Sequence, residues 1–222
     1  MRPGPIIPER TLLNAYRDGI FPMAETRTDS EVFWVDPNRR AIMPLDAFHV
    51  PKRLARTIRT TKLRVTADAA FESVIAACAE TKAGRENTWI NPLIERSYIN
   101  LHVKGHAHSI EVWNGEALVG GLYGVSIGAA FFGESMFSRE TDASKIALIH
   151  LAARLKAGDY ALLDTQFMTE HLKQFGTTEL PKARYKELLA KAVAMKADFY
   201  VLGGAGAAGC VGAVLQLTTQ TS

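Results

Sequence analysis

One segment indicates the fold more clearly than any other: AHSIEVWNGEALVGGLYGVSIGAAFFGESMF, residues 107–137. Apolar and polar residues alternate on both sides of Asn114 and Gly115, and Asn-Gly between such runs is the strongest short-range signal for a β-hairpin. Strand-like sequence then continues through residues 121–127 to a third run at residues 131–137. The segment therefore predicts a three-stranded antiparallel meander.

The third strand of this meander carries a single carboxylate, Glu134, among four large apolar side chains. Moving an ionised carboxylate out of water costs several kcal/mol unless something pairs with it. Glu134 is therefore either a neutralised structural residue or a group that faces a pocket for a polar or cationic ligand. Gly133, beside it, marks a position where a β-bulge changes the alternation of the strand.

A second pair of polar side chains, Asp164 and Gln166, lies in the next strand-like run, YALLDTQF at residues 160–167. Residues two apart on a strand project from the same face. A carboxylate that accepts a hydrogen bond from a carboxamide fixes the direction of that amide, which suits the orientation of a reacting group. The alternative is a satisfied polar pair at the end of a strand. Together with Glu134, these residues are candidate functional groups in two buried strands.

The remaining sequence predicts a mixed sheet with helices, an α+β (mixed α/β) fold. Hydrophobic spacing and turn signals favour helices over residues 10–20, 51–60, 69–79, 94–103, 143–156, 168–175 and 181–195, and strands over residues 32–35, 41–44 and 63–66. We expect a small N-terminal domain at residues 1–48 and a larger domain at residues 49–198.

Residues 199–222 read as a flexible Gly/Ala-rich C-terminal extension. The extension contains a GxGxxG pattern at Gly204, Gly206 and Gly209. A dinucleotide site would need a following helix and strand and an acidic residue about 20 positions later. Because no acidic residue follows Gly209, we do not assign this pattern to a nucleotide.

Composition points to a globular protein without a membrane span. The chain has 222 residues, of which 47% are hydrophobic, and a net charge of +3, which permits an anionic partner without requiring one. Cys78 and Cys210 are far apart and form no CxxC pair, as is usual for a reduced, cytoplasmic chain. No apolar run reaches the roughly 18 to 20 residues of a transmembrane helix, and the proline-rich N-terminus does not resemble a secretory signal.

Four basic residues recur at helical spacing in residues 51–60: Lys52, Arg53, Arg56 and Arg59. Such a stripe suits the neutralisation of nucleic-acid phosphates, and the alternative is an ordinary solvated helix face. His102, His106 and His108 lack the carboxylate or cysteine that would complete a metal shell, so we expect no metal site. The chain also lacks the motifs of nucleophilic hydrolases, P-loop NTPases and zincins.

Eight segments, taken together and in order, resemble the family of leucyl/phenylalanyl-tRNA–protein transferases. They are YRDGIFPM (16–23), FW (33–34) with DPNR (36–39), TWI (88–90), HAHSIEVW (106–113), GGLYGV (120–125), GESMFSR (133–139), ASK (143–145) and LDTQ (163–166). The resemblance implies that Leu or Phe, and less well Met, passes from aminoacyl-tRNA to proteins with N-terminal Arg or Lys. This transfer marks those proteins for N-end-rule degradation and needs no metal, ATP or coenzyme, because the ester is already activated.

The resemblance also implies a fold for the larger domain and roles for particular residues. The domain should be similar to the GCN5-related N-acetyltransferases (GNAT-like). Asp164 and Gln166 should form the catalytic pair, assisted by Glu134. The pocket and the stack for the terminal adenosine should be lined by Trp34, Trp89, Phe131 and Met136. Because strict alternation would separate Phe131 from Glu134, we expect a bulge or twist near residues 132–133.

Two alternative functions stay open at this point. An acetyl-CoA-dependent N-acetyltransferase would use a glycine-rich turn before a helix to hold pyrophosphate. The corresponding connection here is SRETDAS, residues 138–144, which has no glycine and two acidic residues. A non-catalytic module that binds tRNA or a degradation signal is the second alternative, and the cluster of Glu134, Asp164 and Gln166 argues against it.

Overall fold

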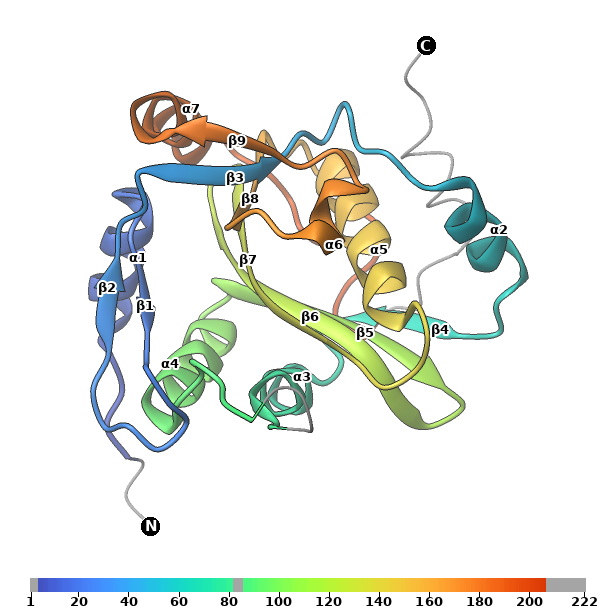
Figure 1. The fold of residues 1–222 in the computed structure, drawn as a ribbon, viewed down its shortest axis with the longest axis horizontal. Coiled ribbons are helices and arrows are strands. Elements are labelled where there is room, and N and C mark those ends of the chain that lie inside the picture. Colours follow the sequence, from blue (N-terminus) through green and yellow to red (C-terminus); the bar gives the residue numbers. More distant parts are fainter. Residues whose placement is uncertain (1–3, 82–85, 207–222) are drawn as a thin grey trace.

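The structure is a computed structural model that describes residues 4–81 and 86–206. Its centre is a seven-stranded sheet in the order β4-β5-β6-β7-β8-β3-β9 (Figure 1). These strands are β3 (Arg39–Met43), β4 (Arg64–Ala67), β5 (Ala107–Asn114), β6 (Ala117–Ile127), β7 (Ala130–Ser138), β8 (Leu162–Gln166) and β9 (Thr178–Pro181). The mixed α+β fold is confirmed, whereas the closer likeness to N-acetyltransferases stays a prediction.

Helices cover both faces of the sheet and divide the core into two apolar clusters. Residues of α2 (Lys52–Thr60) and α5 (Ala143–Ala157) pack in one cluster. The other cluster takes residues from α1 (Glu9–Arg17), α3 (Phe71–Ala79), α4 (Pro92–Val103) and α7 (Lys182–Ala194). In Figure 1 these two sets of helices lie on opposite sides of the long strands β5 to β7. Burial of both faces explains why the central strands are rich in apolar residues.

The predicted meander is strands β5, β6 and β7, joined antiparallel. Its third strand contains a bulge, because Tyr123 of β6 pairs with Ser135 while Gly124 pairs with Gly133. Glu134 is therefore the extra residue of the bulge and has no partner across the ladder. The irregularity expected near residues 132–133 is confirmed. It changes the alternation beyond Glu134, because Met136 packs with the cluster of Phe131 and Phe137 with that of Phe132.

β7 and β8 are the one parallel pair of the sheet and stay together over only three positions. Ala130, Phe131 and Phe132 pair with Leu162, Leu163 and Asp164. Beyond these pairs β7 continues to Ser138, whereas β8 ends at Gln166, whose backbone is left-handed with φ of 61°. Such a φ is uncommon for a residue other than glycine. The sheet is therefore unpaired on one side of β7, next to Glu134.

The N-terminal part differs from the expected grouping of its strands. The strand predicted at residues 41–44 is β3, which pairs with β8 and β9 inside the large sheet. A separate two-stranded ribbon consists of β1 (Phe21–Met23) and β2 (Phe33–Val35). Sequence patterns missed β1 and β9, which are short and each contain a proline. The domain boundary at residue 48 stays a prediction.

The first residues of the C-terminal extension pack against the sheet. Phe199 is buried, stacks on His108 with a ring separation of 4.0 Å and lies parallel to Phe131 at 5.9 Å. The guanidinium of Arg154 donates to the carbonyls of Phe199 and Gly203. The flexibility predicted for the extension also concerns residues 207–222, including Gly209, which lie outside the described residues.

Two further searches cover only residues 4–81 and 86–206. In these ranges no helix combines the length and the apolar character that crossing a membrane requires. Within the same ranges, no three His, Cys, Asp or Glu side chains lie together in a way that would hold a metal ion.

Substitution of Gly124 by Ala should destabilise the protein. A Cβ at Gly124 would lie 2.3 Å from the carbonyl oxygen of Phe132 and 2.4 Å from the ring of Phe131. Overpacking of this kind costs on the order of 1–3 kcal/mol. The matched control is Gly133→Ala in the neighbouring strand, where the nearest atom is 3.4 Å away. Urea unfolding measures both, and equal losses in the two variants would contradict the packing argument.

Candidate active site

A cavity of about 620 Å³ lies where β7 and β8 part. Its wall is mostly apolar and includes Met23, Trp89, Leu122, Met136, Leu148, Leu151, Leu163, Phe167 and Leu172. Glu134 and Gln166 also line it, one from each of the two strands. An apolar pocket with a few convergent polar groups is the usual form of a small-ligand site.

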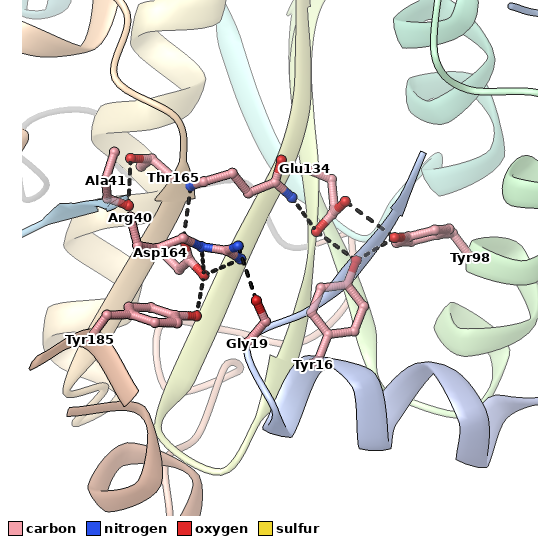
Figure 2. Close-up of polar contacts among 10 residues, drawn as sticks. Tyr16, Gly19, Arg40, Ala41, Tyr98, Glu134, Asp164, Thr165 and Tyr185 are labelled. Carbon is pink, nitrogen blue, oxygen red and sulfur yellow. Dashed lines mark hydrogen bonds and ion pairs between the residues drawn. The ribbon is translucent and has the colours of Figure 1, made fainter. Parts of the chain in front are cut away.

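Glu134 is surrounded by hydrogen-bond donors that carry no charge, as Figure 2 shows. One carboxylate oxygen, Oε1, accepts from the hydroxyl of Tyr16 at 2.7 Å and from the carboxamide of Gln166 at 3.0 Å. The other oxygen, Oε2, accepts from the hydroxyl of Tyr98 at 3.2 Å. The two tyrosine hydroxyls also contact each other. Glu134, for which the sequence indicated no hydrogen-bond partner, therefore has three.

This environment favours the protonated form of Glu134. Burial raises its pKa to about 7, against the opposing effects of the hydrogen bonds from Tyr16 and Gln166. Arg40 lowers the pKa from a greater distance and Asp164 raises it. Burial, followed by the charge of Glu134, also raises the pKa values of Tyr16 and Tyr98. Glu134 is therefore poised to change its charge near neutral pH.

Asp164 has the opposite environment, because its partner is a fully buried cation. The guanidinium of Arg40 donates from Nη2 to Oδ2 at 2.7 Å and from Nε to Oδ1 at 2.9 Å. Tyr185 donates to Oδ2 at 2.6 Å, and the backbone N–H of Gln166 donates to Oδ1 at 2.8 Å. A carboxylate offers about four lone-pair positions, so the acceptor capacity of Asp164 is filled.

The contact between Asp164 and Gln166 differs from the expected one. The carboxylate reaches the backbone N–H of Gln166 and not the carboxamide, because the left-handed backbone of Gln166 redirects its side chain. The carboxamide points instead to Glu134 and so links the two groups of polar residues drawn in Figure 2. Asp164 thus orients Gln166 through the backbone.

The structure brings some of the expected pocket residues together and separates others. Trp89 and Met136 line the cavity. Trp34 lies on β2 with 42% of its surface exposed and does not contribute to the cavity wall. Phe131 is completely buried and is also absent from the wall. Leu151 also forms part of the wall.

The basic stripe lies on α2, and all four of its side chains are exposed: Lys52, Arg53, Arg56 and Arg59. Arg53 forms an ion pair with Asp142 at 2.9 Å, directly before α5. Hydrogen bonds and charge from Arg53 and Lys145 lower the pKa of Asp142 despite its burial. The stripe is thereby attached to the end of α5 whose residue Ser144 reaches the cavity.

Four residues of the site were not predicted from the sequence: Tyr16, Arg40, Tyr98 and Tyr185. Tyr16 lies in one of the motif segments, and Arg40 follows another. Both tyrosines that contact Glu134 occupy buried positions of amphipathic helices, where they are indistinguishable from core residues. The one available signal is that a buried tyrosine hydroxyl needs a hydrogen-bond partner.

Comparison with known proteins establishes the class. The model of the family "Leucyl/phenylalanyl-tRNA protein transferase" matches residues 42–190, and that of its N-terminal domain matches residues 8–38. The protein is therefore an aminoacyltransferase.

Curated relatives with the same description cover almost the whole chain. The leucyl/phenylalanyl-tRNA–protein transferase of Phenylobacterium zucineum is 57% identical over 96% of this chain and 97% of its own. Those of Caulobacter vibrioides and Maricaulis maris are 56% and 54% identical, over 92% and 95% of this chain and 95% and 96% of theirs. The chain belongs to the leucyl/phenylalanyl-tRNA–protein transferase family and transfers aminoacyl groups from tRNA to proteins.

Replacement of Asp164 by Asn should destabilise the whole fold. The change leaves the guanidinium of Arg40 buried without its counter-charge, and breaking such a pair costs on the order of 3–5 kcal/mol. Removal of the neighbouring exposed pair by Glu179→Gln, which frees Arg39 on the same strand, should cost no more than about 1 kcal/mol. Urea unfolding compares the two, and a small loss for Asp164→Asn would contradict the role given to the ion pair.

Proposed function

We propose that the protein transfers Leu or Phe, and less well Met, to the α-amine of proteins that begin with Arg or Lys. In the cytoplasm this transfer would mark such proteins for N-end-rule degradation. The observation that carries the proposal is the cavity between β7 and β8, which combines an apolar wall with Glu134 and Gln166. Its volume suits one large apolar side chain together with the reacting groups.

The donor side follows from the apolar wall. Met136, Leu148 and Leu151 present flexible or branched side chains to the cavity, and discrimination by such a wall amounts to about 1–3 kcal/mol per methylene. A pocket of this kind accepts Leu and Phe together. Trp89, at the wall, and Trp34, exposed on the ribbon, supply aromatic faces on which the terminal adenosine can stack.

The acceptor side has an acidic rim. Glu25 lines a shallow pocket that shares Trp89 and Ser135 with the main cavity, and a further pocket is lined by Glu25, Asp29 and Glu31. A cationic side chain extending from an acceptor amine in the cavity would meet negative charge there. This arrangement supports a preference for N-terminal Arg or Lys.

Each polar residue has a defined part in the proposed reaction. Asp164, held by Arg40, fixes the backbone of Gln166, and the carboxamide of Gln166 positions the attacking amine near the ester carbonyl. Glu134 accepts a hydrogen bond from the nitrogen of that carboxamide and anchors the end of the donor. Because the ester of aminoacyl-tRNA is already activated, the reaction needs no metal, ATP or coenzyme.

The acceptor proposal is tested with two matched peptides. Transfer of radiolabelled Leu from Leu-tRNA should be faster to an Arg-initiated peptide than to the same peptide initiated by citrulline, which has the shape of Arg without its charge. The double variant Glu25→Gln, Glu31→Gln should raise KM for the Arg peptide roughly fivefold, the effect of about 1 kcal/mol. An equal change for the citrulline peptide would contradict the acidic rim.

The basic stripe is proposed to bind tRNA phosphates, with little reading of bases. The double variant Arg56→Ala, Arg59→Ala should weaken binding of Leu-tRNA and reduce the slope of log K against log salt by about two, one for each lost contact. Filter binding at a series of salt concentrations measures the slope. Lys191→Ala, which changes an exposed lysine on α7, is the control and should leave the slope as it is. An unchanged slope in the double variant would refute the assignment.

A further inference from the structure

We propose that Glu134, Tyr16 and Tyr98 form a proton-accepting triad in which Glu134 takes a proton from the α-ammonium group of the acceptor. The inference goes beyond the anchoring role given to Glu134 above. It rests on the acceptor amine entering the cavity and not on a preference for Arg or Lys. Glu134 is then a catalytic residue, and the two tyrosines are positioning residues that act through it.

The reaction requires a proton acceptor. An α-amine has a pKa near 8, so at neutral pH most of it carries a proton and has no lone pair for attack. Formation of the amide releases two protons from the ammonium nitrogen. One goes to Glu134 before the C–N bond forms. The other goes to the departing 3′-oxygen as the C–O bond breaks, and Glu134 later returns its proton to solvent.

Asp164 is not suited to this task. It is completely buried, is absent from the cavity wall and has its acceptor positions filled by Arg40, Tyr185 and the backbone of Gln166. Glu134 lines the cavity, and its Oε2 accepts one hydrogen bond, a long one of 3.2 Å. Oε2 therefore has a lone pair for a proton from the substrate.

When Glu134 is ionised, the triad has one hydrogen too few to make a hydrogen bond at each of its oxygen–oxygen contacts. Glu134, Tyr16 and Tyr98 make three mutual oxygen contacts, but an ionised Glu134 leaves only the two phenolic hydrogens to fill them. A proton on Oε2 completes the ring. Glu134 then donates to Tyr98, Tyr98 to Tyr16, and Tyr16 to Oε1. The arrangement thus stabilises the protonated product of the transfer.

The groups that face Glu134 come from five elements. Tyr16 lies on α1, Arg40 on β3, Tyr98 on α4, Tyr123 on β6 and Asp164 on β8. Burial and then Glu134 raise the pKa of Tyr123, whose hydroxyl is buried without a hydrogen-bond partner among the described residues. The opposite charges of Arg40 and Asp164 act against each other. Desolvation therefore dominates, consistent with a pKa of about 7 for Glu134.

The pH dependence of single-turnover transfer tests the proposal with Glu134→Gln. The wild-type rate should rise with pH and level off above about pH 7, because Glu134 must be ionised to accept the proton. The variant must wait for solvent to deprotonate the amine, whose neutral fraction rises about fivefold between roughly pH 7 and pH 8. The wild-type rate rises less than twofold over the same range, so the deficit of the variant should shrink about threefold. A deficit of constant size at every pH would mean that Glu134 only anchors, and would overturn the proposal.

Tyr98→Phe gives a prediction with an informative sign. Loss of this hydroxyl removes two hydrogen bonds from the protonated ring but only one from the ionised form. The pKa of Glu134 should therefore fall, and the acidic limb of the pH–rate profile should move to lower pH by up to about one unit. If Tyr98 were merely a donor to a carboxylate, the limb would move to higher pH, which would overturn the ring. Tyr160→Phe removes a buried hydroxyl bonded to Ser126 and should leave the limb in place.

Infrared difference spectroscopy reports the proton without relying on activity. A carboxylic-acid C=O band should disappear between about pH 6 and pH 8 in the wild type and be absent from Glu134→Gln. Absence of the band from the wild type would overturn the proposal. His171→Gln changes a titratable side chain of the cavity wall whose Nε2 is buried without a hydrogen-bond partner among the described residues. Loss of the acidic limb from this variant would likewise overturn the proposal.

Discussion

The site depends on the buried ion pair between Arg40 and Asp164. The guanidinium also donates to the carbonyl of Gly19 and lies between the rings of Phe21 and Tyr185, 4.5 Å and 5.1 Å from their centres. One cation thereby joins β3, β8, α7 and the chain after α1. Its desolvation is offset by a full set of partners, so the geometry is fixed wherever the pair is intact. The ion pair also fixes Gln166, which is bonded to Asp164 through its backbone and to Glu134 through its side chain.

Two carboxylates close enough to influence each other have different neighbours. Asp164 has a cation, the guanidinium of Arg40, and two further hydrogen-bond donors, a tyrosine hydroxyl and a backbone N–H, and it is absent from the cavity wall. Glu134 has only neutral donors and opens onto the cavity. Such a separation of environments lets one fold give chemically similar groups different properties.

Much of this was predictable from the sequence, for physical reasons. Asn114 and Gly115 determine a hairpin locally, and a carboxylate such as Glu134 stands out because it interrupts an apolar run. Other features depend on contacts between distant segments. Arg40 follows an ordinary turn, and its burial results from the insertion of β3 beside β8. Phe131 was expected at the pocket, but it is completely buried in the core and absent from the cavity wall.

The packing of Phe199 against Phe131 places the end of the described chain behind the strand that carries Glu134. A ribosome that stopped before residue 199 would release a protein with every polar group of the site and an unfilled space beneath β7. Such a product would lose the packing of Phe199 against His108 and Phe131 rather than any polar group of the site. Synthesis up to Phe199 thus completes the core beside β7 without adding a polar group to the site.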